Sequence, residues 1–357
     1  MPAAPPQVPK EPGPVGPLTQ LGSNYAHLDC VRATAVLLVF FGHLRESLGH
    51  PYGVAGFARL GVIIFFVHTC LVLFLSMNRL GAEHLWARFY IRRIARIYPL
   101  AILAVVAVLL FHIPSAPSLE YSRPDWSTIA ANLALSQNVF EREPMLSPMW
   151  SLAPEVQMYA ILPVLFILHT RRRVPALALW AAALAFSGSL WLLPWDLPWK
   201  VCVYFPCFFS GIVAFSLLGQ AKTQRFTSFL LGMIAAISAG VVAPHVGVPM
   251  FITNSFAALG IGFVIGRLTA IPPFIAHIAT TIAKYSYGIY LAHMPLMWLC
   301  LSGTRHRWVL FTALSIVVPV ILYHAVEHPF IKLGARATAL PKKVDVSSLV
   351  GPKVNVN

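Results

Sequence analysis

Residues 24–50 read NYAHLDCVRATAVLLVFFGHLRESLGH, an apolar stretch that is typical of a membrane helix. Between Val31 and Leu44 the only strongly polar side chains are those of Arg32 and His43. Eleven residues separate them, close to three helical turns, so both should project from one face, roughly 16 Å apart along the axis. Because polar groups are costly inside hydrocarbon, this arrangement favours a functional role. The alternative is an arginine that extends to the membrane edge and a histidine bonded to a neighbouring helix.

The composition places the chain among membrane proteins. Of its 357 residues, 58% are hydrophobic and 11% are charged, whereas soluble proteins carry about 25% charged residues. The net charge of +14 comes from basic residues in short segments between apolar runs. That pattern is typical of cytoplasmic loops and argues against a nucleic-acid partner. Five cysteines without a CxxC pair indicate neither a disulfide framework nor a zinc site, and we expect no bound metal.

The hydropathy pattern predicts an all-α integral membrane protein with about ten transmembrane helices. Basic residues fall on alternate connections, the side that also holds both termini, so we expect both termini in the cytoplasm. The most basic connection, residues 79–96, carries five arginines. On the opposite side lies the long connection at residues 111–149, whose charged residues are mostly acidic. The apolar stretches lie near residues 31–49, 58–77, 96–113, 150–169, 174–193, 201–218, 227–243, 251–268, 280–301 and 308–326.

The chain should contain a single membrane domain, at residues 24–333. Residues 1–23 are rich in proline and lack the apolar segment of a signal peptide, so they predict a disordered cytoplasmic tail. Residues 334–357 predict a second tail of the same kind.

Five segments carry a resemblance to a known family. They read LDCVRATAVLLVFFGH (Leu28–His43), RFYIRRIARIYP (Arg88–Pro99), WSLAPEVQMYAILP (Trp150–Pro163), YSYGIYLAHMPL (Tyr285–Leu296) and EHPFIKL (Glu327–Leu333). In this order they are similar to the conserved segments of acyltransferase family 3, the multi-pass membrane O-acyltransferases that include exopolysaccharide and O-antigen O-acetyltransferases. Each segment is weak evidence alone, but five in the expected order are strong evidence.

The resemblance implies an enzymatic activity and a cellular location. It implies transfer of an acyl group, most simply acetyl from acetyl-coenzyme A, to a hydroxyl of a carbohydrate. The expected partners are therefore the lipid bilayer, acyl-coenzyme A as donor substrate, and a cell-surface or exported glycan as acceptor. The expected location is the inner membrane of a bacterium.

Two residues are the candidates for catalysis. The acceptor hydroxyl needs a base, and histidine is suited to this role because its unperturbed pKa of about 6.5 is near working pH. We therefore predict His43 as the base. Glu155 should lie at a similar depth, where it would orient the imidazole or contact the sugar. The alternative for Glu155 is an ion pair with an intramembrane arginine.

The predicted donor contacts are arginines. Arg93 and Arg96 should lie at the cytoplasmic mouth of the third span, where guanidinium groups would bind the phosphates of coenzyme A. Arg32 faces the same side, with Asp29 as its expected i,i+3 partner. Anchoring of the helix by positive charge is the alternative for these arginines.

Further side chains are candidates for contact with the acceptor. Hydroxyl, amide and aromatic groups suit a sugar, although Trp and Tyr also mark membrane interfaces in general. Ordinary helix-to-helix hydrogen bonding is the default interpretation for the intramembrane histidines at 68 and 293. The predicted substrate contacts are Asp29, Trp150, Ser151, Gln157, Tyr287 and His293.

The sequence also departs from the family and leaves alternatives open. Ile63 stands where an acidic residue is usual, Thr69 and Cys70 replace a serine-glycine pair, and Val156 replaces a common second glutamate. A proton-coupled transporter or exporter that uses Arg32, His43 and Glu155 is one alternative. The same chemistry on a macrolide, a lipid-linked oligosaccharide or peptidoglycan is another, and a catalytically inactive scaffold is a third.

Overall fold

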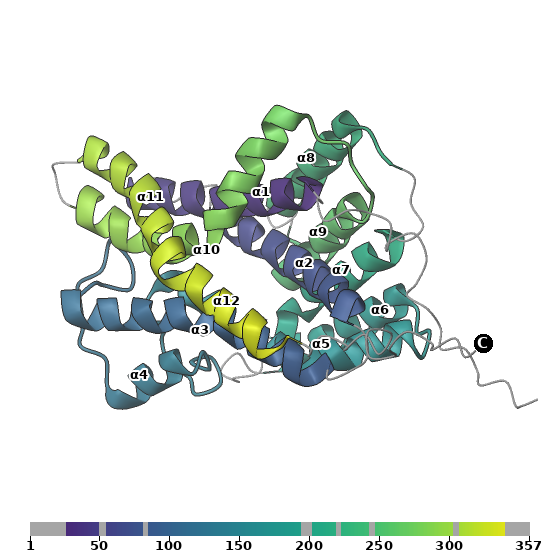
Figure 1. Cartoon of the computed structure of the whole chain (residues 1–357), viewed down its shortest axis with the longest axis horizontal. Helices are drawn as coiled ribbons and strands as arrows, with labels where there is room; N and C mark the ends of the chain where they lie inside the picture. Colours follow the sequence, from purple (N-terminus) through teal and green to yellow (C-terminus); the bar gives the residue numbers. More distant parts are fainter. Residues whose placement is uncertain are drawn as a thin grey trace, which may run out of the picture.

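The computed structural model describes residues 26–49, 55–80, 85–193, 202–218, 223–242, 247–302 and 307–339. Regular structure in these ranges is helical, apart from one isolated bridge between Gln224 and Thr269. Figure 1 shows the helices packed into one bundle. Their bounds are α1 (Ala26–Ser47), α2 (Ala55–Leu80), α3 (Leu85–Phe111), α4 (Trp126–Leu133), α5 (Leu152–Thr170), α6 (Ala176–Trp191), α7 (Phe205–Leu218), α8 (Phe226–Val242), α9 (Met250–Ile265), α10 (Pro273–Leu301), α11 (Trp308–Leu322) and α12 (His328–Ala337).

The all-α membrane architecture expected from the sequence is confirmed, and each of the ten predicted stretches overlaps a helix. Within the described ranges, five helical segments are long and apolar enough to cross a membrane. Four shorter apolar helices accompany them, so the count of ten crossings stays a prediction, as does the side of the termini. The five segments are Ala26–Ser47, Gly56–Arg79, Leu85–Phe111, Ser147–Thr170 and Trp308–Ala337.

One predicted boundary is wrong. The arginine-rich residues 79–96 are not a connecting loop, because α3 already begins at Leu85. At the C-terminal end, α12 continues to Ala337, and Gly334 in it packs against Ala95 of α3. The predicted limits of the membrane domain stay a prediction. Residues 1–25 and 340–357, which hold most of the two predicted tails, lie outside the described ranges.

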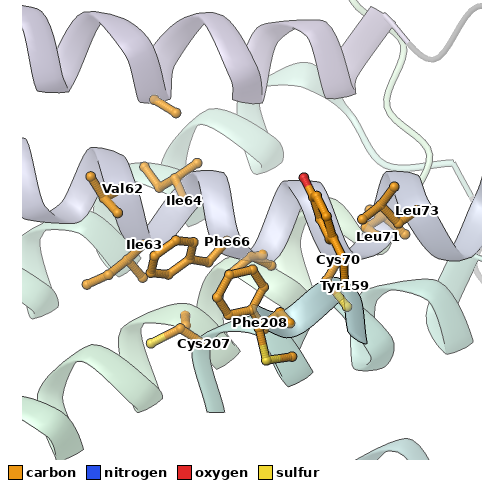
Figure 2. Close-up of a cluster of buried hydrophobic side chains, with 14 of the residues drawn as sticks. Val62, Ile63, Ile64, Phe66, Cys70, Leu71, Leu73, Tyr159, Cys207 and Phe208 are labelled. Carbon is orange, nitrogen blue, oxygen red and sulfur yellow. The ribbon is translucent and has the colours of Figure 1, made fainter. Parts of the chain in front are cut away.

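Helix α2 forms the centre of the bundle. In the most apolar 18-residue stretch of this helix, 78% is buried, a larger share than in any of the other four candidate spans. Figure 2 shows its side chains packed with Cys207 and Phe208 of α7 and with Tyr159 of α5. The rings of Phe66 and Phe208 stack with their centroids 4.2 Å apart. Burial on all sides explains why this helix is apolar around its whole circumference.

Helices α1 and α2 approach closely at a glycine. A Cβ atom on Gly61 would lie 2.6 Å from the carbonyl oxygen of Ala35 and 2.7 Å from a methyl group of Val39. Close backbone approach at small residues is the usual way in which membrane helices associate. This contact holds α1 in place beside α2.

We expect Gly61→Ala to lower the free energy of unfolding by roughly 1 kcal/mol, because the added methyl group overpacks the contact between α1 and α2. Gly56→Ala in the same helix is the matched control, since a Cβ there would meet nothing within 4 Å. Thermal unfolding of both variants in detergent checks this. Equal stability of the two variants would contradict the close contact.

Helices α1 and α10 lie side by side and run in the same direction. Successive contacts along them join Asp29 to Thr280, Arg32 to Ser286 and His43 to His293. The polar face of α1 predicted from the sequence therefore faces α10.

Helices α11 and α12 form one continuous rod through a π-helical turn, η5 (Tyr323–Glu327), and the α12 end of the rod packs on α3 (Figure 1). The π-helical turn places Glu327 toward the bundle, where its side chain is fully buried. On the long connection after α3, Asp125 caps α4 by accepting a hydrogen bond from the backbone N–H of Thr128 at 2.6 Å. Hydrogen bonds from Thr128 and Ser127 lower the pKa of Asp125 to about 2.

Candidate functional site

Five helices and the short 3₁₀ turn η2 (Ser147–Ser151) enclose a cavity of about 70 Å³. Helices α1, α2, α3, α5 and α10 each contribute polar side chains to it. That volume has room for several water-sized groups. The polar lining residues are Arg32, His68, Thr69, Arg93, Arg96, Ser151, Glu155, Tyr159, Ser286, Tyr287 and Tyr290. Such a concentration of charged groups within a membrane bundle marks a functional site.

Arg32 lies at the contact of α1 with α10. Its Nε donates to the hydroxyl of Ser286 at 2.5 Å. The predicted pairing of Arg32 with Asp29 is wrong, because the Asp29 carboxylate instead accepts a hydrogen bond from Thr280 at 2.7 Å. Asp29 therefore helps to join α1 to α10 and lies outside the cavity lining.

Arg93 and Arg96 both belong to α3. Because α3 begins at Leu85, both lie inside the helix, and both line the cavity. Their place at the cytoplasmic mouth of the third span stays a prediction. Arg93 hydrogen-bonds to the side chain of Tyr159. Arg96 forms an ion pair with Glu327, with 3.5 Å between Nη2 and Oε1.

Glu155 faces the arginines. Its Oε1 accepts a hydrogen bond from Tyr159 at 2.5 Å, so Tyr159 links the carboxylate to Arg93. The charges of Arg32, Arg93 and Arg96 all act on this carboxylate. Within the described residues Glu155 forms no ion pair with an arginine, so its closest partner is the hydroxyl of Tyr159.

His43 lies apart from the cavity lining. Its Nδ1 is 2.9 Å from Oε2 of Glu46, and its ring lies 5.3 Å from that of His293, between centroids. The acidic partner of the imidazole is therefore Glu46, not Glu155 as predicted. In a histidine–carboxylate pair of this kind the carboxylate fixes the tautomer and leaves the other ring nitrogen to accept a proton.

Tyr290 connects the two parts of the site. Its hydroxyl lines the cavity and contacts the hydroxyl of Ser151 at 2.7 Å, while its backbone carbonyl is 2.7 Å from Nδ1 of His293. Along α1, the arginine end and the histidine end are roughly 16 Å apart. Tyr290 thus lies between the cavity that holds the arginines and the pair of histidines.

The predicted substrate contacts divide into two groups. Ser151 and Tyr287 line the cavity, and His293 lies against His43. The other three do not line it: Asp29 accepts a hydrogen bond from Thr280, the ring of Trp150 packs 5.4 Å from that of Tyr204, and the amide of Gln157 pairs with that of Asn138.

Sequence reasoning assigned no role to Glu46 or Glu327, and none to Tyr159. Glu46 has a local signal, because it follows His43 by three residues and such residues meet on a helix surface. Glu327 belongs to the EHPFIKL segment, but its pairing with Arg96 spans most of the chain and has no local signal.

We expect Glu327→Gln to lower the free energy of unfolding by roughly 1–2 kcal/mol, because it removes the counter-charge of Arg96. The effect is smaller than for a fully buried pair, since the Arg96 side chain is 29% exposed. Glu120→Gln, in the exposed connection after α3, is the control. Denaturation in detergent measures both variants, and an unchanged Glu327→Gln protein would show that the ion pair contributes nothing.

Comparison with known proteins gives one match. A family model, that of the acyltransferase domain of acyltransferase family 3, matches residues 25–324, almost the whole chain. No curated protein and no solved structure matches the chain significantly.

Proposed function

Since the chain belongs to acyltransferase family 3, we propose that this membrane acyltransferase moves an acetyl group from acetyl-coenzyme A to a hydroxyl of a carbohydrate. The acceptor in this proposal is a cell-surface or exported glycan, and the membrane is the inner membrane of a bacterium.

The observation that carries the proposal is the group of three arginines in one buried cavity. Arg32, Arg93 and Arg96 bring three positive charges, and Glu155 and Glu327 bring two negative charges. The excess is positive and lies inside a membrane bundle, where an unpaired charge is costly. Guanidinium groups bind phosphate through paired hydrogen bonds. A phosphate-bearing donor such as acyl-coenzyme A supplies the missing negative charge.

The distance between Arg32 and His43 along α1 suits such a donor. With its phosphates at the arginines, coenzyme A would extend its pantetheine arm along α1 toward His43, roughly 16 Å away. The arm is long enough for this distance, so the thioester carbonyl would reach the histidine pair. Direct transfer then needs no covalent acyl-enzyme.

The proposed reaction uses His43 as base. The imidazole removes the proton of the acceptor hydroxyl while the hydroxyl oxygen attacks the thioester carbonyl carbon. A C–O bond forms, the C–S bond breaks, and the sulfur leaves as coenzyme A after it takes up a proton from the imidazolium. Glu46, at 2.9 Å from Nδ1, holds the ring and stabilises its positive charge during the transfer.

Aromatic side chains beside the histidines support a carbohydrate acceptor. Phe40 of α1 stacks on Phe311 of α11, with 5.8 Å between ring centroids, and its ring lies 6.3 Å from that of His293. Sugar rings have apolar faces that pack on aromatic rings, and hydroxyl edges that need hydrogen-bond partners. The histidine end offers both kinds of contact.

Labelled acetyl-coenzyme A tests this function in membranes that contain the chain. We expect label in the glycan fraction, and none in membranes that lack the chain. Label in a macrolide or a lipid-linked oligosaccharide would support acyl transfer to that acceptor and would contradict a glycan acceptor. Glycan uptake or export without any label would contradict acyl transfer and favour a transporter.

A further inference from the structure

A group of basic and aromatic side chains surrounds the π-helical turn η5, on the exposed side of the rod that α11 and α12 form. The proposed reaction gives no role to any of these residues. We call them the basic cluster, and they are Lys284 and Tyr285 of α10, Tyr323 and His324 of η5, and His328 and Lys332 of α12.

Lys284 and the two tyrosines lie at the centre of the basic cluster. The Nζ atom of Lys284 is 5.1 Å from the centroid of the Tyr285 ring and 5.0 Å from that of the Tyr323 ring. The two rings meet edge to face, with 5.3 Å between their centroids. These contacts hold the ammonium group of an exposed lysine over an aromatic platform.

The two histidines extend the basic cluster along the rod. Nε2 of His324 is 3.4 Å from the hydroxyl of Tyr285. The ring of His328 stacks on that of Tyr323, with 5.5 Å between centroids. Lys332 follows His328 by four residues in α12, so both project from one face of this helix. The cluster thus presents two ammonium groups and two imidazoles on adjoining turns.

The basic cluster has no acidic member. In the described ranges, neither of its lysines forms an ion pair with a carboxylate. Glu327, in the same π-helical turn, lies on the inner side of the rod, where it pairs with Arg96. Asp29 accepts a hydrogen bond from Thr280, one turn before Lys284 in α10. The positive charge of the cluster is therefore left without a paired carboxylate in this part of the chain, and it is complementary to an anion.

The place of the basic cluster along the rod is that of a membrane boundary. The rod begins at Trp308, directly after Arg307. At about 1.5 Å per residue, His324 is roughly 24 Å from that end and Lys332 roughly 36 Å. The hydrocarbon core of a bilayer is about 30 Å thick, so one boundary at Trp308 places the other between these two residues. Tyrosine is enriched at this level of membrane proteins.

The rod around the basic cluster faces lipid. Only 11% of its most apolar 18-residue stretch is buried. Ile321, Phe330 and Leu333, which flank the cluster, are 56%, 43% and 59% exposed. Figure 1 shows the rod along the outside of the bundle. In a membrane these apolar side chains contact hydrocarbon chains, so the anion that lies next to the cluster is the headgroup of a lipid.

We propose that the basic cluster binds the headgroup of an anionic phospholipid. Lys284 and Lys332 pair with the phosphate group, and the imidazoles of His324 and His328 donate hydrogen bonds to its oxygens. The acyl chains follow the exposed apolar residues of α11 toward the centre of the bilayer. This site is separate from the donor cavity, because no member of the cluster lines that cavity.

The test titrates the purified full chain, in a neutral detergent, with phosphatidylglycerol, which is anionic, or with phosphatidylcholine of the same acyl chains, which has no net charge. Native mass spectrometry gives the dissociation constant of the first bound lipid. We expect the wild type to bind phosphatidylglycerol at least about tenfold more tightly than phosphatidylcholine. The double variant Lys284→Gln and Lys332→Gln should bind phosphatidylglycerol about 10- to 30-fold more weakly than the wild type, the effect of two lost surface charges. Its binding of phosphatidylcholine should be unchanged.

A matched control removes the same charge from another exposed position. Arg171 and Arg172 follow the end of α5, and neither forms an ion pair in the described ranges. The double variant Arg171→Gln and Arg172→Gln should bind phosphatidylglycerol as the wild type does. Thermal unfolding in the same detergent checks that all three proteins are folded.

Several results would overturn the inference. Equal binding of the two lipids by the wild type would reject selection of an anionic headgroup. Unchanged binding of phosphatidylglycerol by the lysine variant would place the lipid elsewhere, and equal weakening by the arginine variant would show a general effect of net charge. Displacement of phosphatidylglycerol by coenzyme A or by inorganic phosphate would assign the basic cluster to a soluble phosphate and contradict a lipid site.

Discussion

Replacement of His43 by alanine should lower acyl transfer at least about a hundredfold, the lower range for loss of a general base. The loss should appear in kcat, because the variant removes the proton acceptor and leaves the arginines intact. Donor affinity should stay unchanged, since His43 and Arg32 are roughly 16 Å apart along α1. Initial rates of label transfer and the binding of coenzyme A measure the two quantities separately.

Two further variants make this prediction specific. Glu46→Gln should cause a smaller loss, because the amide still bonds to the ring but no longer stabilises its positive charge. His169→Ala is the control, since His169 contacts the carbonyl of Val174 at the end of α5 and does not line the cavity. Full activity of His43→Ala would show that another residue is the base, and Glu155 and His293 would be the next candidates.

Replacement of Arg93 by alanine should weaken coenzyme A binding about 10- to 100-fold, the effect of one lost charge-assisted hydrogen bond. The same variant also frees Tyr159 from its contact with the guanidinium group. Adenosine 3′,5′-bisphosphate should lose affinity by a similar factor, because the lost contact is to phosphate.

Arg92 offers a matched control in the same helix. Its Nε donates to the hydroxyl of Thr338 at 2.8 Å, after the end of α12, and it does not line the cavity. Arg92→Ala should therefore leave donor binding unchanged. Equal weakening by the two variants would indicate a general effect of positive charge and would contradict a phosphate site at Arg93.

The positions of the helices could be predicted from the sequence because hydropathy is a local property, averaged over about 20 residues. The start of α3 could not, since its first turns carry the arginines of residues 85–96 and resemble a loop in hydropathy. Only tertiary packing shows that these turns are helical and that Arg93 and Arg96 face a cavity shared with α5 and α10.

The candidate site was predictable in part. The common face of Arg32 and His43 follows from helical periodicity, and both contact α10 as one face would. The depth of Glu155 does not follow from periodicity, because it depends on how α5 sits against α1 and α3. Contacts between distant segments leave no periodic signal in the sequence.

The most direct test of acyl transfer uses the purified chain reconstituted in liposomes with acetyl-coenzyme A and glycan. Acetyl ester on the glycan and free coenzyme A thiol are measured in the same sample. We predict that the two form in a one-to-one ratio, only when glycan is present, and that His43→Ala forms both at least about a hundredfold more slowly. Failure to release thiol with both substrates present, or glycan crossing the membrane unmodified, would contradict the account.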